Sequence, residues 1–184
     1  MTRTRYFTAM SLDGYLADAA GSLDWLLALP DEGQDGAIGD FLANVGAIAM
    51  GATTYEWVLG HEPVLERPEL WREWYGDRPT WVFTHRELPR IPGADVRFVA
   101  GDVAPVHREM ADAAGERDVW LVGGGELAGA FADAGLIDEL VLSVAPVLLA
   151  GGAPLLPRRL EGRLRLTDAR VAGVYAELRY AVGG

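Results

Sequence analysis

The chain has 184 residues, half of them hydrophobic and 23% charged, with a formal net charge of -11 at pH 7. This length and balance predict one globular domain over residues 1–184. The negative charge excludes nucleic acid and anionic membrane surfaces as preferred partners. No apolar run approaches the roughly 20 residues that span a bilayer. No apolar signal core follows Arg3 and Arg5, so we expect a cytoplasmic protein.

Several residue types that carry enzyme chemistry are missing. The chain has no cysteine and no lysine, and all 16 basic residues are arginines. A thiolate nucleophile, a cysteine-bound zinc ion, a Schiff-base lysine and a P-loop lysine are therefore excluded. The histidines match no metal-binding spacing, and no serine lies in a G-x-S-x-G motif. What remains is acid–base chemistry, or chemistry carried by an organic cofactor.

Strands alternate with helices along most of the chain. Apolar, aromatic and β-branched runs predict strands at 3–10, 47–50, 80–84, 96–100, 119–122, 139–145, 164–171 and 174–182. Helices are predicted at 35–44, from 51 onward, at 106–114 and from the glycine turn at 123–125 to 134. This order predicts an α/β fold, in which a mostly parallel twisted sheet has antiparallel edge strands and flanking helices.

Two connecting segments carry notable residues. Residues 61–78 are polar and irregular, and contain Trp71, Trp74 and Tyr75. We interpret them as a solvent-exposed loop held by a few aromatic side chains; a flap or an oligomer contact is the alternative. In the turn after the first strand, Asp13 is expected to bond to its own turn.

Three strand ends carry small or hydroxyl residues. The strand at 119–122 runs into Gly123-Gly124-Gly125 and a helix, Gly51-Ala52-Thr53-Thr54 forms a second such unit, and Thr84-His85-Arg86 ends a third strand. A helix that begins after glycines presents unpaired N–H groups and the positive end of its dipole to a ligand. Ligands of parallel α/β sheets bind beyond the carboxyl ends of strands. The sequence therefore predicts a phosphate-bearing ligand, with a ligand-free left-handed turn as the alternative.

Three blocks occur in the order expected of the dihydrofolate-reductase-like superfamily. They are Ser11-Leu12-Asp13-Gly14-Tyr15-Leu16-Ala17, Met50-Gly51-x-x-Thr54-Tyr55-Glu56 and Val122-Gly123-Gly124-Gly125. The chain most closely resembles the branch similar to the C-terminal reductase domain of riboflavin-biosynthesis (RibD) proteins, and residues 146–152 and 178–180 also look like that branch. The resemblance covers nearly the whole chain.

The resemblance implies an NADPH-dependent reductase and assigns residues to parts of the cofactor. The implied contacts are Ala9, Leu16 and Ala17 at the nicotinamide; Gly51, Thr53, Thr54, Val122, Gly123, Gly124, Gly125, Glu126 and Leu127 around the pyrophosphate; and Thr84, His85 and Arg86 at the adenosine 2′-phosphate. Arginine suits a phosphate because it presents two parallel donors; a simple surface arginine is the alternative for Arg86. Ala52 stands where the family has a basic residue. The resemblance also implies a cis peptide bond between Gly123 and Gly124.

Two carboxylates are candidates for a catalytic role, either to donate a proton or to orient a polar substrate. Counting back from Met50 places Asp35 where dihydrofolate reductases have their pterin-binding carboxylate, and Asp24 falls in the mobile-loop block beside Trp25. Asp35 can instead be only the N-terminal residue of a helix.

The leading hypothesis is a soluble oxidoreductase in which NADPH delivers hydride to a small carbonyl, imine or heterocyclic substrate. Dihydrofolate or pteridine reduction is the narrower alternative. A non-catalytic protein that binds a planar ligand on the same fold is the other.

A homodimer is expected from the distribution of apolar residues. The strand at 139–145 and the loop at 146–156 offer more apolar surface than one domain needs. The other partner would be a small-molecule substrate.

Overall fold

The computed structural model describes residues 2–30 and 34–183, and for residues 34–37 it describes the backbone alone. The strands are β1 (Thr4–Ser11), β2 (Tyr15–Ala17), β3 (Val45–Gly51), β4 (Thr80–Phe83), β5 (Val96–Val99), β6 (Asp118–Val122), β7 (Glu139–Ala145), β8 (Ala153–Pro154), β9 (Leu164–Ala172) and β10 (Tyr175–Val182). The helices are α1 (Asp24–Leu27), α2 (Gln34–Ala43), α3 (Ala52–His61), α4 (Glu69–Tyr75), α5 (Val103–Ala114) and α6 (Gly125–Asp133). In the part of the chain that the structure describes, no helix has the length and apolar character needed to cross a bilayer.

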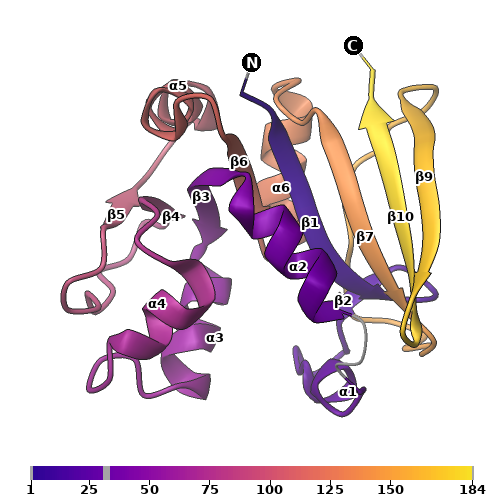
Figure 1. The fold of residues 1–184 in the computed structure, drawn as a ribbon, viewed down its shortest axis with the longest axis horizontal. Helices are drawn as coiled ribbons and strands as arrows, with labels where there is room; N and C mark the ends of the chain where they lie inside the picture. The colour runs from indigo at the N-terminus through magenta and orange to yellow at the C-terminus, as the bar shows by residue number, and fades with distance from the viewer. Residues whose placement is uncertain (1, 31–33, 184) are drawn as a thin grey trace.

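Eight of these strands form one sheet, in the order β5-β4-β3-β6-β1-β7-β10-β9 (Figure 1). The strands from β5 to β7 in this order are parallel, whereas β10 runs antiparallel to β7, and β9 to β10. β2 and β8 form a separate two-stranded sheet. The predicted architecture, a mostly parallel sheet with antiparallel strands at one edge and flanking helices, is therefore confirmed.

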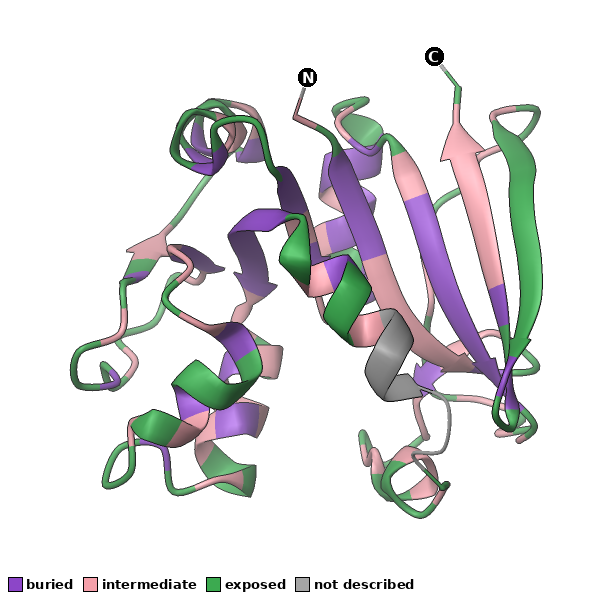
Figure 2. Cartoon of the chain, viewed as in Figure 1, coloured by how far each residue is buried: buried purple, intermediate pink, exposed green. Residues whose placement is uncertain are grey.

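The sheet is covered on both faces, and β3 shows how residues are divided between them. Ala47 and Ala49 pack with α5 and α6 in one buried cluster, whereas Ile48 and Met50 pack with α2, α3 and α4 in the other. Successive residues of a strand point to opposite faces, so a strand covered on both sides needs an unbroken apolar run. Figure 2 shows this burial concentrated in the central strands.

Residues 61–78 contain the helix α4, so the expectation of an irregular loop there is wrong. Trp71 and Tyr75 are buried, and their ring centroids lie 4.4 Å apart. Residues four apart lie on the same face of a helix. Burial of this aromatic face against the sheet stabilises α4, although Glu69, Arg72 and Glu73 make much of the helix polar. Trp74 points away and is exposed.

The apolar strand β7 does not offer a dimer surface. It lies inside the sheet between β1 and β10, and every residue from Leu140 to Ala145 is buried. The part of the dimer argument that rests on this strand is therefore wrong, because its apolar residues belong to the core of one chain. Exposed apolar side chains lie instead at Leu148 and at Leu164, Leu166 and Val171 of β9. Figure 2 shows this edge strand as mostly exposed.

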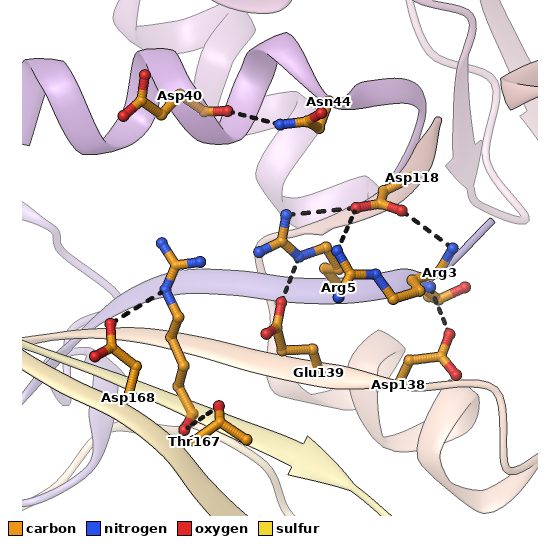
Figure 3. A network of polar contacts seen from close by, with 11 residues as sticks. Arg3, Arg5, Asp40, Asn44, Asp118, Asp138, Glu139, Thr167 and Asp168 are labelled. Atoms are coloured by element: carbon orange, nitrogen blue, oxygen red, sulfur yellow. Dashed lines mark hydrogen bonds and ion pairs between the residues drawn. The ribbon is translucent and has the colours of Figure 1, made fainter. Parts of the chain in front are cut away.

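A buried ion-pair network joins three strands at their amino ends (Figure 3). Arg5 of β1 is 5% exposed, and its Nε donates to Oε2 of Glu139 on β7 at 2.5 Å. Its Nη1 lies 3.4 Å from Oδ2 of Asp118 on β6, and the guanidinium lies 4.8 Å from the ring centre of Phe41 on α2. Loss of one partner would leave a buried charge unpaired. The network therefore holds β1, β6 and β7 in register, at the end of the strands opposite to their carboxyl ends.

Candidate functional site

A pocket of about 330 Å³ lies where β3, β4 and β6 end. The parallel register brings these ends together, since Gly51 pairs with Phe83 across β3 and β4, and Met50 pairs with Val122 across β3 and β6. The residues that line the pocket are Gly51, Ala52, Thr53, Thr54, Phe83, Gly124, Glu126 and Leu127.

Two helices begin at this pocket. α3 follows Gly51 and α6 follows Gly124; both glycines have extended backbone angles, and neither helix has a side-chain cap. The first N–H groups of a helix lack partners within the helix, and the dipole places partial positive charge at that end. Two uncapped N-termini at one pocket favour an anion, such as a phosphate group, between them.

Gly123 brings the starts of the two helices into contact. Its φ is +96°, and a Cβ built on it would lie 1.9 Å from Oγ1 of Thr54 and 2.8 Å from the Cβ of Thr54. Only glycine fits this combination of backbone angle and close approach. The Gly123–Gly124 peptide bond is trans, so the expected cis bond is wrong. The chain reverses instead through the left-handed backbone angle of Gly123.

Tyr6 of β1 holds this turn from the core. It is 1% exposed, and its hydroxyl oxygen lies 2.9 Å from the carbonyl oxygen of Gly123 and 3.1 Å from that of Leu155. A phenol has one hydrogen to donate, so the two carbonyls share it. Burial raises the pKa of Tyr6 far above its usual range. The hydroxyl therefore stays protonated and acts as a donor.

The loop that follows β7 packs against the start of α6. A Cβ built on Gly125 would lie 2.5 Å from the carbonyl oxygen of Pro154 and 2.6 Å from that of Leu155. The same loop contains β8, which pairs with β2 in the small sheet. The segment after β1 and the loop after β7 are therefore joined next to the glycine turn.

Asp13 adds hydrogen bonds between the segment after β1 and the loop after β7. Its carboxylate accepts hydrogen bonds from the hydroxyl of Ser11 at 2.6 Å, from the N–H of Ala150 at 2.7 Å and from the N–H of Leu149 at 3.1 Å. These hydrogen bonds lower the pKa of Asp13, and the bond from Ser11 has the largest effect. The prediction that Asp13 bonds to its own turn is confirmed, and the structure adds the contact with the distant loop.

Most residues predicted to surround the pyrophosphate lie at the pocket. Those that line it are Gly51, Thr53, Thr54, Gly124, Glu126 and Leu127. The same strand end and glycine turn also contain Val122, Gly123 and Gly125, which do not line the pocket. The structure adds Ala52 and Phe83. Phe83 directly precedes the strand end at Thr84, and this position was its only signal in the sequence.

The residues assigned to the nicotinamide do not line this pocket. Ala9 lies on β1 and pairs with Ser143 of β7, while Leu16 and Ala17 lie on β2. Leu16 is buried and Ala17 is half-buried. Their proximity to a nicotinamide stays a prediction.

Arg86 lies three residues beyond Phe83, with its charge already paired. Nη1 and Nη2 donate to Oε1 and Oε2 of Glu56 on α3, each at 2.8 Å. Oγ1 of Thr84 accepts a hydrogen bond from the Arg86 N–H at 2.9 Å, and His85 is exposed. The strand end is therefore ordered by its own contacts, and a phosphate would compete with Glu56 for the guanidinium.

The described residues do not place either candidate proton donor in the pocket. Asp24 is exposed in the first turn of α1. Asp35 lies in the first turn of α2, and its side chain is outside the described part of the structure. Beside Asp24, the buried Nε1 of Trp25 has no hydrogen-bond partner among the described residues. The acid roles of both carboxylates stay predictions.

Comparison with solved structures defines the class of fold. A putative riboflavin biosynthesis protein from Shewanella sp. PV-4 matches with a TM-score of 0.79 and 27% identity, over all of both chains. Dihydrofolate reductase from Enterococcus faecalis, complexed with NADP(H), matches with a TM-score of 0.62 over 99% of this chain and 97% of that chain; at 16% identity it shows likeness of fold alone. The fold is dihydrofolate-reductase-like.

Sequence comparison narrows this class to one family. The family model of the RibD C-terminal domain matches residues 64–175. The protein YwjB of Bacillus subtilis is 31% identical over 179 residues, which cover 97% of each chain. The chain therefore belongs to the RibD C-terminal domain family, as the three sequence blocks indicated. Membership of this family supports a reductase-type function.

Proposed function

We propose that the protein is an NADPH-dependent reductase that acts on a small carbonyl, imine or heterocyclic substrate. The observation that carries this proposal is the pocket at which α3 and α6 begin, with both helix N-termini uncapped. The cofactor, when bound, supplies the hydride. The chain binds and orients it and shields it from water.

The pocket residues fit the phosphate groups of a dinucleotide. The free N–H groups at the starts of α3 and α6 would hold the pyrophosphate, and the hydroxyls of Thr53 and Thr54 would add donors. A Cβ built on Gly124 would meet no atom within 4 Å, so the protein leaves open space beside this residue. Arg86, just beyond the pocket, would bind the 2′-phosphate with its two parallel donors.

Cofactor binding is testable by energy transfer from tryptophan to the dihydronicotinamide during titration with NADPH. We expect saturable binding by the unmodified protein. The variant Gly123→Ala should lose it, because the new Cβ would overlap the Thr54 side chain and separate the two helix starts. Gly101→Ala is the matched control, since Gly101 has the same φ of +96° and no atom within 4 Å of an added Cβ.

The outcome also separates an enzyme from a binding protein. Absence of binding at about 1 mM NADPH would refute the proposal, because a dissociation constant above about 1 mM is too weak for specific recognition. Binding without oxidation of NADPH across carbonyl, imine and pteridine substrates would instead indicate a non-catalytic protein.

We also propose that the protein is a homodimer. The support comes from exposed apolar side chains, with Leu148 68%, Leu166 51% and Val171 84% exposed. Two of these lie on β9, whose outer edge is unpaired in the described sheet. Light scattering measures the mass in solution, and a monomeric mass at micromolar concentration would contradict the proposal.

A further inference from the structure

The pair formed by Arg86 and Glu56 has the geometry of a closed ion pair. Both guanidinium nitrogens of the fork bond to separate carboxylate oxygens at 2.8 Å, which is the two-bond arrangement that arginine would otherwise offer to a phosphate. The side chains are 58% and 38% exposed. An exposed pair of this kind is weak, so a dianionic group can displace the carboxylate.

The pair lies next to the candidate cofactor pocket. Glu56 is four residues after Ala52, so it lies one helical turn along α3 from a pocket-lining residue, on the same side of the helix. Arg86 follows Phe83, which lines the pocket from the end of β4. Both partners are therefore attached to segments that form the pocket wall.

No described residue that lines the pocket is a cation. Arg158, which lies along α6, is paired with Asp133 at 2.7 Å and with Glu126 at 3.4 Å. Arg86 is thus the cation that β4 and α3 place near the pocket, and Glu56 neutralises it before any ligand arrives.

We propose that Glu56 determines how strongly this site prefers NADPH to NADH. A 2′-phosphate that binds Arg86 must displace or share the Glu56 carboxylate, and it is repelled by that carboxylate. NADH carries no 2′-phosphate and meets neither cost. Glu56 therefore weakens the binding of NADPH selectively. This inference rests on the proposed function, since it concerns the cofactor of that site.

The test compares dissociation constants of NADPH and NADH, measured by fluorescence, for the unmodified protein and for Glu56→Gln. Glutamine is similar in size but removes the charge. We expect NADPH to bind roughly five- to thirty-fold more tightly and NADH to change less than about two-fold, from the strength of one exposed pair and one screened repulsion. Adenosine 2′,5′-bisphosphate, as a competitor, should gain affinity by the same factor as NADPH.

Two controls isolate the contact from general charge effects. Glu69, the first residue of α4, forms an exposed ion pair with Arg67. Glu69→Gln makes the same change of net charge and should leave the ratio of the two dissociation constants unchanged. In an Arg86→Gln background, Glu56→Gln should lose most of its effect, because the two residues act through one contact.

The possible outcomes are distinct. Equal changes for NADPH and NADH, or no change for either, would overturn the role of Glu56 while leaving a functional dinucleotide site. If no form of the protein bound either dinucleotide, the proposed function would fail, and this inference would fail with it.

Discussion

The hydroxyl of Tyr6 couples the core of the sheet to the glycine turn, and the variant Tyr6→Phe removes that hydroxyl. The ring keeps its place in the core, but the carbonyls of Gly123 and Leu155 lose their shared donor. A buried group that loses its hydrogen bond costs about 1–3 kcal/mol. We expect the free energy of unfolding to fall by about 1–2 kcal/mol, since one hydrogen serves both carbonyls. For a chain of this size the melting temperature falls about 2–4 °C for each kcal/mol.

The same variant should weaken NADPH binding a few-fold, because the turn that joins α3 and α6 loses its support. Thr80→Val is the matched control. Thr80 is fully buried, and its hydroxyl donates to the carbonyl oxygen of Arg78 at 3.2 Å, at the opposite end of β4 from the pocket. Unfolding in urea and titration with NADPH are measured on both variants. The reasoning is refuted if Tyr6→Phe is as stable as the unmodified protein, or if the two variants lose equal cofactor affinity.

Two further predictions concern ionisable side chains that contact the amino ends of the strands. Burial lowers the pKa of His107, whose Nε2 lies 2.7 Å from Oγ1 of Thr4, so the folded state favours the neutral ring. The unfolded chain takes up a proton near pH 6.5, and stability is therefore lost as the pH falls below about 6.5. Urea unfolding at several pH values compares the free energies of unfolding of the unmodified protein and His107→Gln, and the difference between them should shrink on acidification. A difference that stays constant with pH would contradict this. Glu139→Gln should lower the free energy of unfolding by about 2 kcal/mol in the same assay, because it removes a charged partner from the buried Arg5. The control Glu69→Gln, in an exposed ion pair, should leave the urea midpoint unchanged. Similar losses of stability for both variants would argue against the network.

Much of the fold could be predicted because the relevant signals are local. The alternation of strand and helix patterns, with glycine turns between them, indicated a parallel sheet, and the alternating pattern of 164–171 and 174–182 indicated the hairpin that became β9 and β10. The helix α4 was missed, because only Trp71 and Tyr75 mark its buried face. A two-residue strand such as β8 has too few residues to show any periodicity, and its formation depends on β2.

The candidate site was predicted in part, and the two parts differ in physical origin. Residues at strand ends and helix starts, such as Thr54 and Gly124, were found because their position follows from local structure. The partner of Arg86 was not foreseen, since Glu56 lies 30 residues earlier in the chain. The cis peptide bond between Gly123 and Gly124 was expected from resemblance alone. In the structure the bond is trans, and the chain turns through the positive φ of Gly123.

The amino-acid sequence by itself predicted most of the strands and helices of this protein and the chemistry left open to it. Apolar runs and helical spacing specify strands and helices through local backbone preference, and the absence of cysteine and lysine removes whole classes of catalysis. The tertiary structure alone decided which groups meet. The contact of Gly123 with Thr54 and the pairing of Arg86 with Glu56 depend on the register of β3 with β6 and β4. Register is set by the packing of both faces of the sheet at once, which no single segment of the sequence encodes.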